Sequence, residues 1–256
     1  MSLESVLREK RDLGRKLLVA YVTAGISADW LDFVQGCVDG GADAVEIGLP
    51  FSDPIMDGPI IAGASQTALE RGVTAEGILD ELSTRSFTAP LIAMTYFNVL
   101  YHPGIDVSLG RLQKAGVQAV IIPDLPFDES NSWRESAHSR GIETVLLAAP
   151  STPDDRLNSI AQDSEGFIYA VGLMGVTGER ENLASSAQTI ATRLKKITDK
   201  PVLIGVGVSN PEQAREACQV ADGVVVGSAI VRRMLTGEPP SQVGNFVSSL
   251  RTGIDE

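Results

Sequence analysis

The sequence predicts an α/β protein folded as a single (β/α)8 barrel, the TIM barrel, with residues 1–256 forming one domain. Three observations lead to this fold. Apolar runs alternate with amphipathic stretches along the whole chain, about eight such units are present, and one short pattern recurs three times. Repeated β-then-α units are typical of parallel sheets, and about eight units in a chain of this length favour closure into a barrel.

The apolar runs are continuous rather than alternating in polarity, which is typical of strands buried on both faces of a parallel sheet. The first run is LLVAYVTA, and Gly, Pro or charged residues bound the others. The predicted strands cover residues 17–24, 44–50, 91–97, 119–125, 143–150, 167–173, 201–208 and 223–228.

Amphipathic stretches between these runs predict helices. The stretch 30–41 ends at Gly40 and Gly41, a typical stop signal. The other predicted helices lie within residues 70–85, 106–116, 129–141, 153–162, 181–197 and 210–220. Pro59, Pro153 and Pro211 stand where a helix would begin, which suits a residue without an N–H group.

A weak internal repeat supports the same layout. GGADAVEIG at 40–48, AGVQAVIIP at 115–123 and VADGVVVGS at 220–228 each join a small-residue turn to an apolar strand. An open doubly wound sheet is the alternative. It is disfavoured because no G-x-G-x-x-G follows the first strand and the units continue to the C-terminus.

Composition excludes several classes of protein. The chain has 21 basic and 33 acidic residues, a net charge of −12, and no basic face for nucleic acid. No apolar run is long enough to span a membrane, and the charged N-terminus does not resemble a secretory signal. Cys37 and Cys218 are expected as buried thiols in a cytoplasmic protein. His102 and His138 have no paired ligands, so we expect no metal site.

Glu46 is the first candidate catalytic residue. It interrupts the apolar run 44–50, and an ionised carboxylate is costly to bury without a partner. Burial would raise its pKa and suit it to proton transfer near neutral pH. Asp57 follows in the loop PFSDPIMDGP, where it could equally be a turn or capping residue. One carboxyl group in an apolar site and one in a wetter site form a candidate acid–base pair.

Glycines gather at the ends of the last three predicted strands, where phosphate-binding sites recur in these barrels. Their backbone N–H groups can approach an anion closely, although tight turns alone would also explain them. The residues concerned are Gly178, Gly205, Gly207, Gly227 and Ser228.

With these motifs, the sequence resembles the tryptophan synthase alpha subunit family over nearly its whole length. The block VEIGLPFSDPIMDGP at 45–59 is similar to the family pattern E-[IL]-G-x-P-[FY]-S-D-P-x-x-D-G-P. Further similar segments are MTYFN, PDLP, FIYAVGLMGVTGER, GVGVS and VVGSAIV. The chain departs from the family at Ile60, Ala62 and Val206 and in the first loop, TAGISAD.

The resemblance implies a lyase of tryptophan biosynthesis that cleaves indole-3-glycerol phosphate to indole and glyceraldehyde 3-phosphate by a retro-aldol reaction. It implies that Glu46 is the general acid and base and that Asp57 stabilises positive charge on the indole ring. The substrate-binding residues that it implies are Tyr169, Thr177, Gly178, Gly207, Gly227 and Ser228.

The resemblance also implies a partner, the beta subunit of an α2β2 complex, which would carry pyridoxal phosphate. The chain itself is expected to need no metal or organic cofactor. Asp53, Pro54 and Pro126 are the residues expected at the partner interface. Three alternatives remain at this point: a stand-alone lyase that releases indole, a non-catalytic activator of a beta-type partner, and a phosphosugar isomerase on the same fold.

Overall fold

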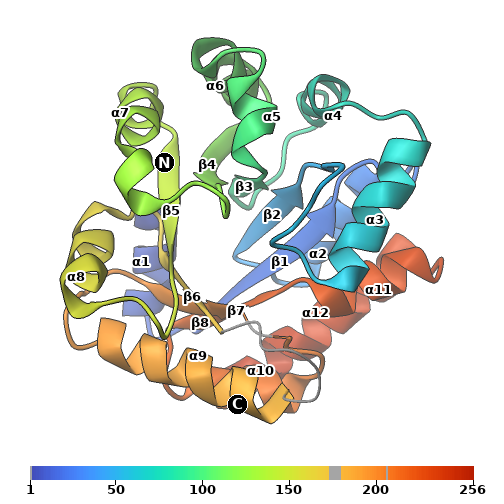
Figure 1. Ribbon diagram of the computed structural model, residues 1–256. Helices are drawn as coiled ribbons and strands as arrows, with labels where there is room; N and C mark the ends of the chain where they lie inside the picture. The colour runs from blue at the N-terminus through green and yellow to red at the C-terminus, as the bar shows by residue number, and fades with distance from the viewer. Residues whose placement is uncertain (1, 173–179, 206) are drawn as a thin grey trace.

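Eight parallel strands form a closed barrel in the order β1 to β8, with helices around the outside (Figure 1). The computed structural model describes residues 2–172, 180–205 and 207–256, without the side chains of residues 180–185. The strands are β1 (Leu17–Thr23), β2 (Ala44–Gly48), β3 (Leu91–Met94), β4 (Val117–Ile121), β5 (Glu143–Ala148), β6 (Ile168–Val171), β7 (Val202–Gly205) and β8 (Gly223–Val226). Leu17 and Gly223 are paired where β1 meets β8, which closes the ring.

Helices follow most of the strands and cover the outer surface of the barrel (Figure 1). The helices are α1 (Leu3–Asp12), α2 (Trp30–Asp39), α3 (Pro59–Glu70), α4 (Ala75–Leu82), α5 (Phe97–Tyr101), α6 (Ile105–Lys114), α7 (Asn131–Ser139), α8 (Asp154–Asp163), α9 (Arg180–Leu194), α10 (Pro211–Cys218), α11 (Ser228–Leu235) and α12 (Pro240–Asp255), with a short 3-10 helix η1 (Phe127–Glu129). The predicted barrel is therefore confirmed.

Several predicted elements differ from the structure at their ends. The predicted strand 91–97 stops at Met94, because the Asp124 carboxylate accepts a hydrogen bond from the Phe97 N–H at 2.9 Å where α5 begins. The predicted helix 70–85 is divided between α3 and α4, since Gly72 adopts φ +80°. Pro59 and Pro211 begin helices as predicted, whereas Pro153 lies one residue before α8.

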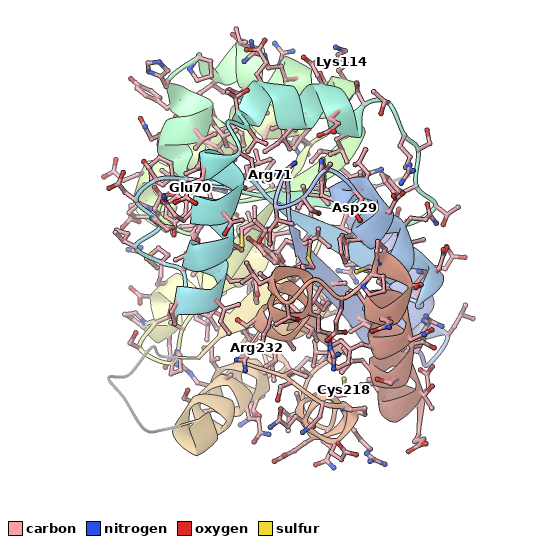
Figure 2. All side chains as sticks on the ribbon, turned by 90° about the vertical axis from the view of Figure 1, so that its right-hand side faces the viewer. Asp29, Glu70, Arg71, Lys114, Cys218 and Arg232 are labelled. Atoms are coloured by element: carbon pink, nitrogen blue, oxygen red, sulfur yellow. The ribbon has the colours of Figure 1, made fainter. Side chains whose placement is uncertain are left out.

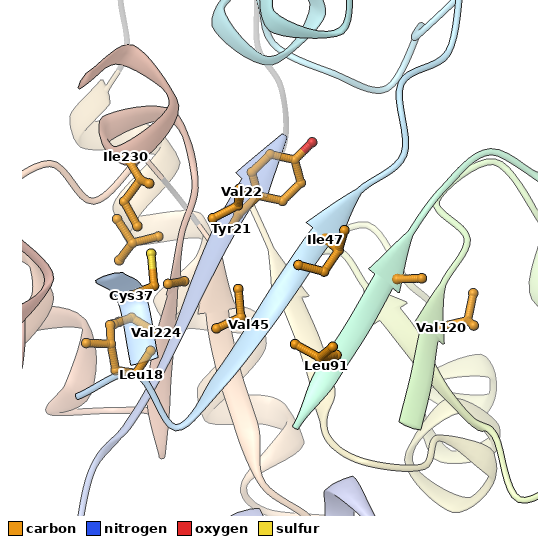
Figure 3. Packing of buried hydrophobic residues seen from close by; sticks show 14 of the residues in the cluster. Leu18, Tyr21, Val22, Cys37, Val45, Ile47, Leu91, Val120, Val224 and Ile230 are labelled. Carbon is orange, nitrogen blue, oxygen red and sulfur yellow. The ribbon is translucent and has the colours of Figure 1, made fainter. Parts of the chain in front are cut away.

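The core has two layers, as expected for a barrel wrapped by helices. An inner cluster fills the barrel and includes Val19, Ala44, Ile92 and Leu203. An outer cluster lies between strands and helices, and Figure 3 shows part of it, with Leu18 and Val224 facing Cys37 of α2. Because successive side chains along a strand point to opposite faces, Leu17 and Val19 of β1 belong to the inner cluster, and Leu18 between them belongs to the outer one.

Helix α1 covers the amino end of the barrel. Leu3 and Leu7 are fully buried in the inner cluster. The Ser2 side chain caps the helix, and the Glu143 carboxylate of β5 accepts a hydrogen bond from the Glu4 N–H at 2.9 Å. The predicted helices did not include this segment, since the charged residues between the two leucines conceal them in the sequence.

A buried carboxylate joins both ends of the chain to the barrel. Asp43 is fully buried and accepts hydrogen bonds from the Leu18 N–H at 2.8 Å and from Arg251 of α12 at 3.0 Å. Lys10 and Arg15 also contact it, at 3.0 and 2.9 Å. Every charge buried with Asp43 therefore has a partner.

Three further observations concern the two cysteines, a contact at the end of α3 and the length of the helices. Cys37 and Cys218 are free and buried, and Cys218 lies on α10 (Figure 2). Figure 2 also shows Arg71 at the end of α3, where its Nε donates to the Gly25 carbonyl at 3.1 Å. Among the described residues, no helix has the length and apolar character needed to span a bilayer.

Candidate active site at the carboxyl end of the barrel

Glu46 lies in the middle of β2, between Tyr21 of β1 and Ile92 of β3 in the strand register. It is only 1% exposed, and its Oε2 atom has no hydrogen-bond partner. No basic side chain forms an ion pair with it in the part of the chain that the structure describes. The carboxyl group is thus buried without the pairing that stabilises Asp43.

Burial is the main cause that raises the pKa of Glu46 from 4.5 to about 8, and the nearby Asp57 carboxylate raises it further. The side chain therefore holds its proton at neutral pH. A carboxyl group with this pKa can both donate and accept a proton near neutrality.

Asp57 lies in the loop between β2 and α3 and is partly exposed. Burial raises its pKa to about 6, and a hydrogen bond to the Tyr96 hydroxyl opposes this rise. The N–H of Asp57 donates to the Pro54 carbonyl at 3.0 Å, so the turn interpretation is also correct. Asp57 is the more readily ionised member of the pair, as the two environments predicted.

Tyr96 is a site residue that the sequence analysis did not identify. Its hydroxyl accepts a hydrogen bond from the Met56 N–H at 2.9 Å, and its ring stacks on Phe51 with centroids 4.9 Å apart. Tyr96 therefore holds both ends of the loop that carries Asp57. The only signal in the sequence was its place at the end of a strand, in the segment MTYFN.

Two tyrosines lean across the mouth of the barrel over glycines. A Cβ atom on Gly48 would lie 1.9 Å from the Tyr21 hydroxyl, and one on Gly205 would lie 2.1 Å from the Tyr169 ring. Each glycine is needed because a side chain there would displace the ring. Burial raises the pKa of Tyr169 well above 10, and Glu46 adds to this rise.

The glycines predicted to bind phosphate lie together at the ends of β7 and β8, which are neighbouring strands. Gly207 adopts φ +49°, and Gly227 precedes α11, whose first residue is Ser228. The first N–H groups of a helix have no partner within it and favour an anion. Thr177 and Gly178 lie outside the described residues.

The three predicted interface residues lie on two loops at this end of the barrel. Asp53 and Pro126 are exposed, and Pro54 is partly exposed. Ile55, beside them, is 81% exposed, which is unusual for so apolar a side chain. Within the described part of the chain, no group of three His, Cys, Asp or Glu side chains is arranged to hold a metal ion.

Comparison with known proteins decides the family. Residues 7–247 match the family model described as "Tryptophan synthase alpha chain". The chain belongs to the tryptophan synthase alpha chain family. The curated alpha chain of Picosynechococcus is 40% identical over 261 residues, covering 99% of both chains. That of Streptomyces coelicolor is 42% identical over 237 residues, covering 91% of this chain and 88% of its own.

Solved structures give the same result. The tryptophan synthase alpha chain of Legionella pneumophila superposes with a TM-score of 0.88 at 28% identity, covering 100% of this chain and 98% of its own. A tryptophan synthase structure from Mycobacterium tuberculosis gives a TM-score of 0.89 at 34% identity, covering 98% and 97%. These comparisons confirm the resemblance to the tryptophan synthase alpha chain family over nearly the whole length of the chain.

Proposed function

We propose that this chain cleaves indole-3-glycerol phosphate to indole and glyceraldehyde 3-phosphate, as the lyase subunit of tryptophan synthase. The observation that supports this most strongly is the buried, unpaired Glu46 next to the more exposed Asp57. A protonated acid and a carboxylate side by side suit a reaction in which one proton is delivered and another removed.

In the proposed mechanism, protonated Glu46 delivers its proton to C3 of the indole ring. Positive charge then develops on the ring nitrogen, and the Asp57 carboxylate stabilises it. The bond between C3 and the hydroxyl-bearing side-chain carbon breaks, and its electron pair returns to the ring. The Glu46 carboxylate accepts the hydroxyl proton as the aldehyde forms, so the enzyme ends with its original protons.

The substrate lies across the mouth of the barrel in this proposal. Its phosphate binds backbone N–H groups at Gly207 and Gly227 and the Ser228 hydroxyl, together with Thr177 and Gly178. Tyr169 contacts the indole ring. The support is the placement of Gly207, Gly227 and Ser228 on two neighbouring strand ends, where an acidic protein still offers an anion a partial positive charge.

The proposed partner is a beta subunit in an α2β2 complex, and pyridoxal phosphate belongs to that partner. Asp53, Pro54 and Pro126 form the contact on this chain, and the exposed Ile55 beside them supports an interface there. We also propose that the whole chain works as one domain and in the cytoplasm. The support for a reducing compartment is that Cys37 and Cys218 are both free.

The deciding experiment measures indole release from indole-3-glycerol phosphate by the full chain, first alone and then with a beta-type partner. We expect slow cleavage alone and strong activation by the partner. High activity without the partner would instead identify a stand-alone lyase. Absence of cleavage under both conditions, by a chain that is folded, would contradict the proposed function and favour a non-catalytic activator.

A further inference from the structure

Tyr21 spans the two halves of the candidate site. Its ring begins beside Gly227 at the end of β8, where a Cβ atom on the glycine would lie 3.5 Å from that of Tyr21. Its hydroxyl ends over Gly48 at the end of β2. Figure 3 shows the ring at the carboxyl end of β1 with its hydroxyl on the side of β2. One side chain thus reaches from the proposed phosphate end to the carboxyl pair.

The hydroxyl is surrounded by acidic groups and keeps its proton. Tyr21 is 6% exposed. Burial and then the Asp57 carboxylate raise its pKa, and Glu46 and Tyr96 contribute in the same direction. A hydrogen bond to the Thr23 side chain opposes this rise in pKa without reversing it. The Tyr21 O–H is therefore a neutral hydrogen-bond donor inside a site whose other facing groups are carboxyls, a second phenol and the Thr23 hydroxyl.

We propose that Tyr21 is a specificity-determining residue, whose ring lies under the glycerol segment of the substrate and whose hydroxyl binds a hydroxyl of that segment. The inference rests on the proposed function for the identity of the substrate. Between a phosphate at Gly227 and a reacting carbon at Glu46, only the three-carbon polyol remains to be recognised. The phenol of Tyr21 lies along that line.

The geometry also explains why β2 ends in glycine. Alanine at position 48 would place a methyl group 1.9 Å from the Tyr21 oxygen, so the hydroxyl would have to move. A site built to hydrogen-bond a ligand hydroxyl discriminates against an analogue that lacks it, because the site's polar group is left unpaired. Tyr21 therefore distinguishes polyol phosphates from alkyl phosphates.

The test measures binding of glycerol 3-phosphate and 1-propyl phosphate to the full chain by calorimetry. The wild type should prefer glycerol 3-phosphate. Tyr21→Phe, which retains the ring, should lower the affinity for glycerol 3-phosphate by about 5-fold and leave the affinity for 1-propyl phosphate unchanged. Gly48→Ala should act in the same direction by displacing the hydroxyl. Tyr101→Phe is the matched control, because Tyr101 is 63% exposed on α5, and it should change neither affinity.

Equal affinities of wild type and Tyr21→Phe for glycerol 3-phosphate would overturn the inference. An equal loss of affinity for both ligands would also overturn it, since that result indicates a distorted pocket rather than a lost hydroxyl group. Binding is measured without turnover, so the result stays separate from the proposed lyase activity. An inactive wild type that still shows the Tyr21-dependent preference would contradict the reaction and support the polyol site.

Discussion

Asp43 and Glu46 lie three residues apart, Asp43 directly before β2 and Glu46 in the middle of it, and both are buried. Asp43 accepts hydrogen bonds from a backbone N–H and from three basic side chains. Glu46 has an oxygen with no partner. The barrel thus places a stabilised carboxylate at the amino end of β2 and a carboxyl group without such pairing further along the same strand, toward the carboxyl end where TIM barrels carry their chemistry.

Because Asp43 is paired and Glu46 is not, ionisation of Asp43 stabilises the folded protein, whereas ionisation of Glu46 destabilises it. Removing one partner of a buried ion pair leaves a charge uncompensated, so Asp43 supports the fold. Glu46 binds its proton more tightly in the folded state, with a pKa near 8 against 4.5. Its contribution to the free energy of unfolding is complete below pH 4.5 and is lost as the pH rises through 8. The reactive site is maintained at a cost in stability at alkaline pH.

The largest effect is expected from Glu46→Gln, which keeps the shape of the side chain and removes the titrating proton. Cleavage should fall by about 10³-fold or more, because proton transfer contributes this order of rate. Binding of glycerol 3-phosphate should be retained. Thermal unfolding should also lose the part of its pH dependence between 4.5 and 8 that Glu46 contributes, while the part due to Asp57 remains. Turnover comparable to wild type would exclude Glu46 as the acid and base.

Asp43→Asn should affect stability rather than chemistry. Removing the charge leaves Arg251, which is 8% exposed, without one of its carboxylate partners. The free energy of unfolding should fall by about 3 kcal/mol in urea titrations. The rate per folded molecule should stay within about 2-fold of wild type, the range of an effect below 0.5 kcal/mol. A specific loss of rate in fully folded protein would contradict the division between the two ends.

Asp57→Asn tests the second carboxylate. The kcat should fall by about 10²-fold, as for removal of a preorganised group that stabilises developing charge. Stability should change little, because Asp57 is partly exposed. Asp53→Asn is the matched control for the isolated chain, since Asp53 is exposed on the same loop. An unchanged kcat would show that Asp57 only stabilises the turn and has no part in the reaction.

The smallest effect is the dependence of activity on pH in the wild type. Protonated Glu46 and ionised Asp57 are needed together, so activity should fall below pH 6 and above pH 8. One pH unit beyond either limit, kcat/KM should be about 10-fold below its maximum. The two groups interact, so the two limits belong to the pair. In Asp57→Asn the acid limit should disappear, and its persistence would assign that limit to another group.

The barrel and the candidate role of Glu46 can both be predicted from the sequence, and the same physical reason, burial of the strands on both faces, underlies both predictions. Eight continuous apolar runs require burial on both faces, and a single carboxylate in such a run has no neighbouring charge to pair with. The phosphate glycines follow from their position at strand ends. Their substrate contacts stay predictions.

What the sequence did not predict depends on distant contacts. Tyr96 has a role because it reaches the Met56 N–H, 40 residues away in the chain. The end of β3 is set by Asp124 from the following β/α unit. Asp43 looks like a polar turn residue until Arg251 is placed beside it, 208 positions later. Such pairings follow from closure of the barrel and have no local pattern.

The Asp43 cluster has a consequence for the order in which the protein is made. Residues 10, 15 and 43 are synthesised early, whereas Arg251 is made 208 residues after Asp43. Until then Asp43 lacks the one basic partner that is itself buried. We therefore expect a chain that stops before Arg251 to be less stable than the chain that includes it, and to be cleaved more readily by proteases.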